Sequence, residues 1–525
     1  MDNKTKKKLA FVFLTLILLM LLRVDYRFKN TVECCSDEYD YFLHASTLVF
    51  DLDFDYSNQK LRNPHYSYND IKAPMGFVGS GILASPFLYI GNLFTKVKNE
   101  SISETIMNYE LLVYSFSSIF YFFLSYLILY KIMKLMGNNL GKYKLLLYFS
   151  ATGLPYYSFE RFGMTHSYEV FTIILLIYLI IKYYQNDKFR NIYAFFIPIV
   201  LLISFLTRMS NFFIFLIPVI VKNYLFKNKT PLFKNIYFLF SNLLSLVTFV
   251  NISNMIYGRV IFNPQIIYGD SRDIGSAFKN INKTFFDMLS SFLNTLFTFE
   301  FGIFWMNPIL FIGLLLTVKK LIDYKSIINW VTLICFAQCF YIVYLWQTTA
   351  SSYGFRYLFP LIPLSFFVYF HNNNENKLRA NYLTYFSIFS FLGIVFFETT
   401  ILTQLSTTPQ VNSFGTYIEY VEPEYVKGLF LSFFNIESYY IIFTTSFLGA
   451  ITFKILLTIF GVENVIQFLF SLNLPVQNKD FQNYIENLSI IGIDKFIFSL
   501  IFIMTLAFVV VYKIGNKNKK NDLTI

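Results

Sequence analysis

The chain has 525 residues, of which 55% are hydrophobic and 14% are charged, whereas roughly a quarter of the residues in soluble domains are charged. This composition leaves too little polar surface to cover a soluble protein and excludes that class. The formal net charge of +11 comes from Lys and Arg in short clusters between apolar runs. That placement is typical of membrane proteins under the positive-inside rule and predicts no nucleic-acid partner.

Apolar runs of about 20 residues, the length that crosses a bilayer core, recur along the whole chain. They predict about 13 transmembrane helices. These lie near residues 9–23, 106–133, 143–158, 167–184, 191–206, 211–226, 235–257, 299–318, 327–347, 355–371, 381–403, 436–460 and 494–513. The first run follows several lysines and precedes no small-residue cleavage site, so we interpret it as an uncleaved anchor.

The distribution of lysines predicts which side of the membrane each loop faces. If the lysine-rich start is cytoplasmic, alternation of the spans places further basic clusters on that side, at 142–144, 182–190, 222–234, 319–325 and 377–379. The basic tail at 513–520 would face outward with 13 spans, against the rule. One segment near 436–493 is therefore either miscounted or re-entrant.

The longest polar stretch before the C-terminal part, residues 24–74, is predicted to lie outside the cytoplasm and holds nine of the 32 Asp and Glu residues. Within the first outer loop, residues 24–104, the segments 38–50 and 75–94 are apolar with polar interruptions. This pattern is typical of helices that lie on the membrane interface or dip into it. A true span at 75–94 would invert the later topology, and the lysine pattern argues against it.

An adjacent acid pair, Asp37 and Glu38, lies just outside the first predicted span. A carboxylate in a partly desolvated pocket can accept a proton from a hydroxyl that attacks an electrophile. Adjacent residues point to different sides of a helix, so we expect only one of the two to face a cleft. The alternative is a solvated acid pair that caps a helix.

Two cationic residues suit an anionic ligand. Lys72, which precedes Ala73-Pro74, can bind a lipid phosphate as a point charge, or it can be an ordinary interface lysine. Arg356 lies at the outer end of a predicted span, where a charge is costly and where its planar fork suits a phosphate or pyrophosphate. The alternative for Arg356 is a structural ion pair with a loop acid.

Four further residues near predicted outer span ends are candidates for substrate binding: Arg161, His166, Arg208 and Tyr353. His166 can assist acid–base chemistry or bind a hydroxyl, although a lone His near an interface is more often structural. The chain has no Gly-rich phosphate loop, paired CxxC set or HExxH. It therefore carries no signal for ATP, zinc or redox chemistry, and we predict no cofactor. A divalent metal near the acidic loop stays open as an alternative.

Four motifs follow one another within residues 1–370: SDEYDYFLHASTLVFDLDFDY, KAPMGFVGSGILASPFLYIG, FGIFWMNPIL and SSYGFRYLFPLIPL. Their order resembles the C-type (GT-C) membrane glycosyltransferases, which include protein O-mannosyltransferases and lipid A aminoarabinose transferases. The resemblance implies an all-α bundle of about 11–13 transmembrane helices with interfacial helices in its first outer loop. It also implies transfer of a sugar from a polyprenyl-phosphate donor to an acceptor on the extracytoplasmic face.

The resemblance further implies roles for single residues. Asp37 would be the general base that activates the acceptor hydroxyl, and Glu38 would support it. Lys72 and Arg356 would meet the donor phosphate. The family's usual Lys-Pro-Pro is Lys-Ala-Pro in this chain, which weakens the assignment of Lys72.

These observations predict a catalytic membrane module at residues 1–403 and a C-terminal membrane region of unknown role at 404–525. An O-antigen-type polymerase or ligase would place its main loops late in the chain, and a transporter or flippase would place charges within spans. Both stay as alternatives. The sugar is open, as is whether the acceptor is lipid, glycan or protein. The content of Asn, Lys, Ile and Phe is typical of an AT-rich bacterial gene and predicts the inner membrane.

Overall fold

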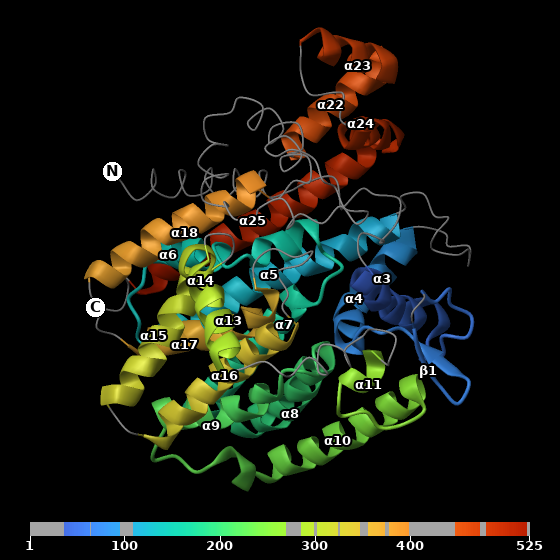
Figure 1. Cartoon of the computed structure of the whole chain (residues 1–525). Helices are drawn as coiled ribbons and strands as arrows, with labels where there is room; N and C mark the ends of the chain where they lie inside the picture. Colours follow the sequence, from blue (N-terminus) through green and yellow to red (C-terminus); the bar gives the residue numbers. More distant parts are fainter. Residues whose placement is uncertain are drawn as a thin grey trace.

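The computed structural model is a bundle of helices with one small β-hairpin at its edge (Figure 1). It describes residues 36–62, 65–94, 109–268, 285–298, 302–323, 326–346, 355–372, 377–397, 447–472 and 479–521. Within these residues six helices are long and apolar enough to cross a membrane. A helix pairs its own backbone N–H and C=O groups, which lipid cannot do. The described residues therefore have the all-α architecture of an integral membrane protein.

The first half of the chain begins with short elements and continues into long helices. It contains α3 (Ser36–Ser46), the π-helical turn η1 (Thr47–Asp51), β1 (Tyr66–Tyr68), β2 (Ile71–Ala73), α4 (Val78–Phe94), α5 (Tyr109–Leu135), α6 (Lys142–Ser150), the π-helical turn η3 (Tyr156–Glu160), α7 (His166–Gln185), α8 (Arg190–Thr207), the 3₁₀ turn η4 (Phe212–Leu216), α9 (Ile217–Leu225), the 3₁₀ turn η5 (Leu232–Lys234) and α10 (Ile236–Tyr257). Strands β1 and β2 pair antiparallel across Asn69 and Asp70, which both have positive φ as a two-residue hairpin turn requires.

The second half continues the bundle and ends in a long helix. It contains α11 (Gln265–Tyr268), α13 (Phe285–Phe297), α14 (Ile303–Met306), α15 (Pro308–Asp323), α16 (Ile327–Trp346), the 3₁₀ turn η6 (Arg356–Leu361), α17 (Ile362–His371), α18 (Lys377–Phe397), α22 (Phe447–Phe460), α23 (Val462–Ser471), α24 (Lys479–Ile490) and α25 (Ile493–Asn521).

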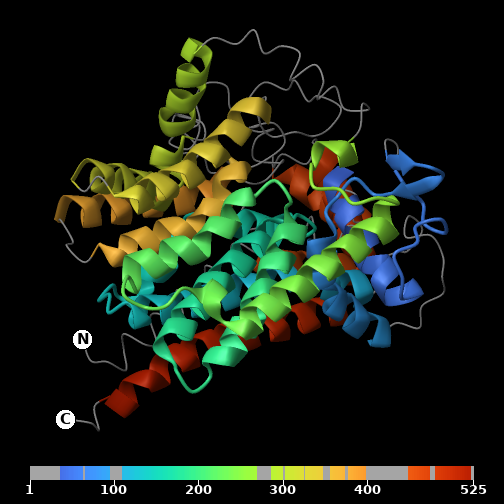
Figure 2. The same ribbon diagram turned by 90° about the horizontal axis from the view of Figure 1, so that it is seen from below.

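Helices α5 and α7 form the centre of the bundle, and α10 lies at its outside (Figures 1 and 2). Most side chains of α5 and α7 are buried, and the two helices pack against each other. Helix α10 packs on α8 and exposes large apolar side chains such as Phe240 and Leu243. An exposed apolar face of this length suits contact with lipid.

The six long helices confirm that six of the predicted spans are apolar helices of spanning length. The segments 106–133, 167–184, 191–206, 235–257, 327–347 and 494–513 correspond to α5, α7, α8, α10, α16 and α25. The predicted span 381–403 overlaps α18, and the predicted anchor at 9–23 lies outside the described residues. Helices α3 and α4 occupy the two segments predicted as interfacial, 38–50 and 75–94. Their position relative to a membrane stays a prediction.

Four other predicted spans are not single continuous α-helices. The segment 143–158 divides into α6 and η3 around Gly153, whose φ is +76°, and Pro155. The segment 299–318 breaks between α14 and α15 at Asn307 and Pro308, and 211–226 and 355–371 begin with the 3₁₀ turns η4 and η6. Within the described part of the chain, six helices, or seven if the bent pair α22–α23 is one span, are long and apolar enough to cross a membrane. Gly and Pro break the other four apolar runs into shorter pieces, and the total of about 13 spans stays a prediction.

The C-terminal region contains a sharply bent helix pair followed by the long helix α25. Helices α22 and α23 are bent by 114° at Gly461, whose φ is +79°. This bent pair lies within 436–493, where the sequence predicted a miscounted or re-entrant segment. Helix α25 then runs along α5, where Phe502 stacks on Phe116 with ring centroids 4.4 Å apart. Its C-terminal end lies on the same left-hand side of Figure 1 as the start of α18.

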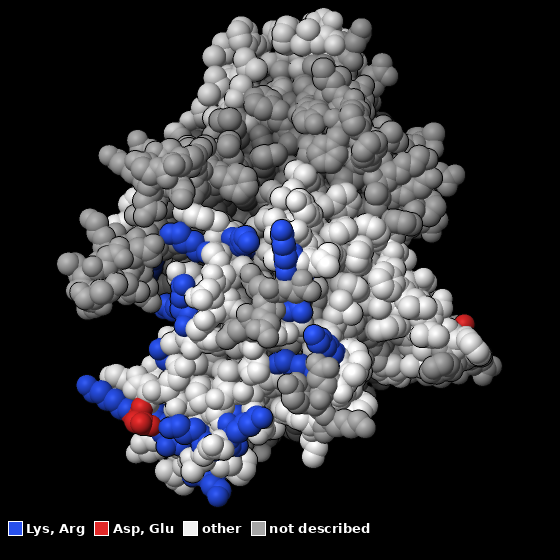
Figure 3. Space-filling view, turned by 90° about the vertical axis from the view of Figure 1, so that its left-hand side faces the viewer, with Lys and Arg blue, Asp and Glu red and all other residues white. Residues whose placement is uncertain are grey.

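Basic side chains gather on that left-hand side, which we call the basic face (Figure 3). In the sequence, exposed lysines lie at the ends of helices and in the short loops that join them: Lys144, Lys188, Lys229, Lys319, Lys377 and Lys513. The basic tail thus shares a side with the earlier clusters, as the positive-inside rule requires. The bent pair α22–α23 is a broken span or a re-entrant loop, which fits the miscounted or re-entrant segment that the sequence predicted near 436–493.

Candidate active site at the arginine-rich end

Helix α3 presents two acids in its first turn, where the positive end of the helix dipole favours carboxylates. Successive residues of a helix are rotated by about 100°, so Asp37 and Glu38 face different surroundings. The Asp37 side chain is 25% exposed, whereas that of Glu38 is 4% exposed. Asp37 is therefore the carboxylate that a ligand can reach from outside.

The rest of α3 is held in place by buried polar contacts. His44 lies with Nδ1 2.5 Å from the Tyr56 hydroxyl and Nε2 2.9 Å from the backbone oxygen of Gly76. Burial lowers the pKa of His44 to about 4, so its ring is neutral at pH 7. Near the other end, Asp40 pairs with Arg62 at 3.1 Å. These contacts fix the direction in which α3 points its first turn.

Two glycines of α4 allow the neighbouring elements to approach α3. A Cβ on Gly79 would lie 2.3 Å from the backbone nitrogen of Thr207, at the end of α8. A Cβ on Gly81 would lie 2.5 Å from the Cβ of His44. The small residues of the Gly79-Ser80-Gly81 segment thus let α4 pack closely on both α3 and α8, and this brings Arg208 into the same region.

The first buried ion pair joins α3 to the segment before α7. Glu38 Oε1 lies 3.2 Å from Arg161 Nε, and both side chains are almost fully buried. A Cβ on Gly163 would lie 2.8 Å from the Cβ of Glu38, so the lack of a side chain there permits this approach. A buried charge needs such a partner because its desolvation is costly.

The second pair is longer and more open. Asp37 Oδ2 lies 3.9 Å from Arg356 Nη2, at the start of η6. The Arg356 side chain is 11% exposed, and its guanidinium carbon lies 5.4 Å from the centre of the Tyr357 ring. At 3.9 Å the two groups attract each other without a short hydrogen bond. This pair therefore joins a buried cation to a carboxylate that remains accessible.

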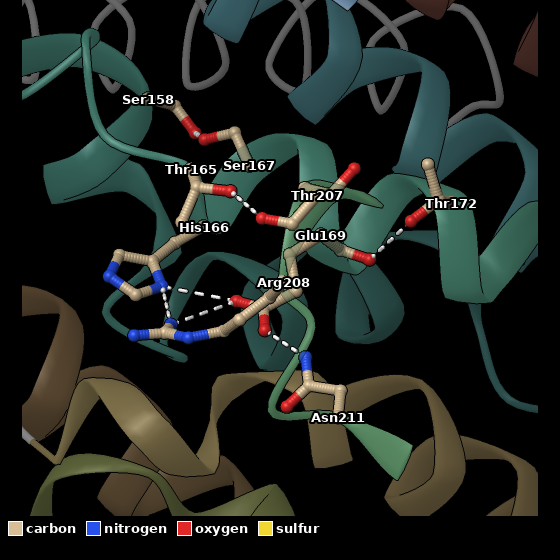
Figure 4. Close-up of polar contacts among 9 residues, drawn as sticks. All are labelled: Ser158, Thr165, His166, Ser167, Glu169, Thr172, Thr207, Arg208 and Asn211. Atoms are coloured by element: carbon tan, nitrogen blue, oxygen red, sulfur yellow. Dashed lines mark hydrogen bonds and ion pairs between the residues drawn. The ribbon is translucent and has the colours of Figure 1, made fainter. Parts of the chain in front are cut away.

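The third group surrounds Glu169, a fully buried carboxylate in the first turn of α7 (Figure 4). Glu169 Oε2 lies 3.2 Å from His166 Nδ1 and 3.4 Å from Arg208 Nη1, and Asn211 donates its side-chain amide to Glu169 Oε1. The guanidinium carbon of Arg208 lies 4.4 Å from the centre of the Tyr357 ring. Tyr357 thus lies close to Arg208 as well as to Arg356.

Six of the eight candidate residues from the sequence belong to these three groups: Asp37, Glu38, Arg161, His166, Arg208 and Arg356. Lys72 is on β2 with an exposed side chain, and none of the contacts described above involves it. Tyr353 lies outside the described residues. The roles predicted for Lys72 and Tyr353 stay predictions.

Three residues of the network were missed from the sequence: Glu169, Asn211 and Tyr357. Glu169 has a recognisable signal, because an acid inside a predicted span is a candidate functional residue by default. It also follows His166 by three residues, which places both on one face of a helix. Asn211 and Tyr357 lie near arginines in the sequence, but only the packing of α7, α8 and η6 shows what they contact.

The network lies at the end of the bundle opposite the basic face. Helices α7 and α8 pack against each other, and the short loop between them carries Lys188. His166 is at the far end of α7 from that loop, and Arg208 follows the far end of α8. We call this the arginine-rich end.

The arrangement offers a partly exposed carboxylate next to a buried cation. Such a pair can accept a proton from one group and stabilise negative charge on another. Among the described residues, no three His, Cys, Asp or Glu side chains are placed to hold a metal ion. The prediction of metal-independent chemistry stays a prediction.

No protein-family model matches the chain, and no curated protein matches it. A solved oligosaccharyltransferase from Archaeoglobus fulgidus, in its apo form, is similar over 75% of this chain with 12% sequence identity and a TM-score of 0.43. The match spans 56% of the length of the archaeal protein. At this TM-score the likeness is too weak to support a function.

Proposed function

We propose that this chain is a membrane glycosyltransferase that moves a sugar from a polyprenyl-phosphate donor to an acceptor at the arginine-rich end. One observation carries the proposal: Asp37, an accessible carboxylate, lies 3.9 Å from the buried Arg356. Transfer from a lipid phosphate needs these two functions, a base for the acceptor and a cation for the leaving group. The ordered motifs of the sequence support the same function.

In the proposed step, Asp37 takes the proton of the acceptor hydroxyl. The acceptor oxygen then forms a bond to the anomeric carbon of the donor sugar. The bond between that carbon and the phosphate oxygen breaks, and polyprenyl phosphate leaves with an additional negative charge. Arg356 stabilises this charge, and the single displacement inverts the configuration at the anomeric carbon.

The three ion pairs assign different tasks to the acids. Glu38 is buried in an ion pair with Arg161. Its proposed task is to hold the first turn of α3 in place and thereby support Asp37. Glu169 is buried and contacts both Arg208 and His166. Of the three network carboxylates, Asp37 has the most exposed side chain and the longest separation from its arginine. A general base needs this accessibility to reach a substrate hydroxyl.

The positive-inside rule supports an extracytoplasmic site. The basic face is proposed to lie in the cytoplasm, which places the arginine-rich end at the opposite surface. A polyprenyl-phosphate donor stays in the bilayer, so the transferase would bind it at membrane level. For a bacterial chain this membrane is the inner one, and the acceptor is a lipid, glycan or protein of the cell envelope.

The test is sugar transfer in membranes from a labelled polyprenyl-phosphate donor pool, compared between wild type and Asp37→Asn at equal expression. We expect the variant to lose about 10²- to 10⁴-fold in rate, the usual contribution of a general base. Asp70→Asn is the matched control. Asp70 is an exposed acid in the hairpin turn, where its φ is +65° and Asn fits equally well.

Three outcomes decide between the proposed transferase and the alternative functions. Loss of transfer in Asp37→Asn, with full transfer in Asp70→Asn, supports the transferase and its base. Full transfer in both variants removes Asp37 from the site. Absence of transfer from any donor by the wild type, together with lipid-linked glycan polymerisation or movement of a lipid across the membrane, would favour the polymerase or flippase instead.

A further inference from the structure

His166 leaves one buried nitrogen without a partner. Its side chain is 1% exposed, and Nδ1 lies 3.2 Å from Glu169 Oε2. The other ring nitrogen, Nε2, is buried and has no hydrogen-bond partner within the described part of the chain. An unsatisfied buried polar atom is destabilising, so it marks a position where a ligand atom or water would be stabilising.

Arg356 leaves a second such nitrogen. Its Nε is also buried and also lacks a hydrogen-bond partner among the described residues. In a 3₁₀ turn, residues three apart lie on the same side, so Arg356 and Phe359 share one side of η6. The Phe359 ring lies 5.6 Å from the His166 ring. The two unpartnered nitrogens therefore lie in the same aromatic surroundings.

Tyr157 completes these surroundings. Its ring centroid lies 4.5 Å from that of His166 and 5.4 Å from that of Phe359. Arg356 also interacts electrostatically with Tyr157. Aromatic rings around two polar nitrogens are typical of sites that bind small polar ligands, because they shield the hydrogen bonds from water.

Glu169 and Arg208 determine what His166 offers to a ligand. His166 Nδ1 lies 3.2 Å from Glu169 Oε2 and also 3.2 Å from Arg208 Nη1. With the proton on Nδ1, His166 donates to the Glu169 carboxylate, Arg208 donates to Glu169 Oε2 at 3.4 Å, and Nε2 carries a lone pair that accepts from a hydroxyl. With the proton on Nε2, Nδ1 accepts from Arg208 and Nε2 donates to a hydroxyl oxygen, so a hydroxyl fits either form. Figure 4 shows the His166 ring and the Arg208 guanidinium side by side, pointing away from Asn211 and Thr172.

We infer that Glu169 is a positioning residue that orients His166 to recognise one hydroxyl of the transferred sugar. His166 Nε2 and Arg356 Nε, on two residues that share aromatic neighbours and interact electrostatically, suit a ligand with a hydroxyl close to an anionic oxygen. A glycosyl phosphate has this chemistry, whereas a bare lipid phosphate lacks the hydroxyl. The inference rests on the proposed function and adds to it a residue that recognises the sugar rather than the phosphate.

The experiment measures binding by the full-length protein in detergent, with two kinds of probe. Decaprenyl phosphate tests the phosphate part, and decaprenyl-phosphoryl hexoses with their monodeoxy analogues test the sugar part. We expect wild type to bind one monodeoxy analogue at least about tenfold more weakly than its parent, because a site built for a hydroxyl rejects a ligand that lacks it.

Glu169→Gln and His166→Phe are expected to lose this discrimination and to bind the parent and that analogue equally. Both should bind decaprenyl phosphate within about twofold of wild type, since Arg356 is intact. His166→Phe keeps an aromatic ring against Tyr157 and Phe359, so it stays informative if the Gln variant unfolds. Thr172→Val is the matched control on α7, because the Thr172 hydroxyl bonds to the Glu169 backbone oxygen and to Ser204 but to neither the Glu169 carboxylate nor the His166 ring.

The outcomes separate this inference from the proposed function. Discrimination by wild type that both variants lose supports the role of Glu169 and His166. Binding of decaprenyl phosphate with equal affinity for every deoxy analogue overturns the inference and leaves the transferase intact. Failure to bind decaprenyl phosphate or any decaprenyl-phosphoryl hexose would overturn both. Discrimination that survives in Glu169→Gln and His166→Phe would assign it to other residues.

Discussion

The two ends of the helix bundle carry positive charge in opposite ways. At the basic face, Lys and Arg side chains gather on the surface (Figure 3), and lysines such as Lys144 and Lys377 are exposed near helix ends. At the arginine-rich end, Arg161, Arg208 and Arg356 are buried, and each lies within 4.0 Å of a carboxylate. An ammonium group is strongly hydrated and prefers the surface, whereas a guanidinium group tolerates burial when its planar fork meets an acid.

The difference indicates that charge serves two purposes in this molecule. Exposed lysines need no fixed geometry to set the orientation of the helices in a membrane. Buried arginines need a fixed partner, so each one constrains the packing of the elements that carry it. Arg356 and Asp37 are 3.9 Å apart, and the Asp37 side chain is partly exposed. In such a pair the cation can also bind a ligand.

The largest effect on stability is expected from breaking a buried ion pair. Arg161→Met leaves Glu38 buried without its cation and should destabilise the fold by about 3–5 kcal/mol. The double variant Arg161→Met with Glu38→Leu should recover most of that loss, because no buried charge remains. Unfolding in detergent micelles, followed for both variants, measures the difference. Equal destabilisation in the single and double variants would show that shape, and not charge, dominates at this position.

Removing Arg356 should act mainly on transfer. Arg356→Ala takes away the proposed stabiliser of the leaving phosphate and should lower kcat by about 10²- to 10³-fold. Arg356→Lys should recover part of the rate, since it keeps the charge but loses the planar fork. If Arg356→Ala destabilises the protein as strongly as Arg161→Met does, Arg356 has a structural role like that of Arg161.

The pH dependence of stability should report on His44. Burial lowers its pKa to about 4, below the value of about 6.5 in an unfolded chain. The unfolded state therefore binds the proton first, and this contribution is present above pH 6.5 and is lost as the pH falls towards 4. It amounts to about 3 kcal/mol at most.

The measurement is the Tm in detergent as a function of pH, for wild type and for His44→Gln, which does not titrate. The Tm of wild type should fall more steeply than that of the variant between pH 6.5 and 4. Parallel curves for the two proteins would mean that His44 does not titrate in the folded state differently from the unfolded state.

The smallest effects are expected from exposed lysines. Lys72→Ala should raise the KM for the donor by up to about fivefold if Lys72 meets the donor phosphate, because an exposed charge contributes about 1 kcal/mol or less. Lys144→Ala, a matched exposed lysine on the basic face, should leave kcat and KM unchanged. Equal kinetics in both variants would assign Lys72 to the ordinary interface lysines.

The long helices were predictable because their signal is local. A run of about 20 apolar residues suffices to identify α5 or α10, whatever surrounds it. Breaks within apolar runs were less visible: Gly153, Pro155 and Pro308 were present in the sequence, but composition averages over them. The bend of 114° between α22 and α23 lies at a single glycine, Gly461, whose positive φ of +79° is open to glycine.

The sequence by itself determined the helical membrane class, the separation of lysine clusters from the acidic loop, and most of the charged residues that form the site. It did so because the cost of placing charge in lipid is a property of each residue and its neighbours in the chain. The tertiary structure alone decided which acid meets which arginine. Those pairs join residues 39 to 319 positions apart, so they depend on how α3, α7, α8 and η6 pack. It also decided that the Asp37 side chain is partly exposed, whereas those of Glu38 and Glu169 are buried in ion pairs.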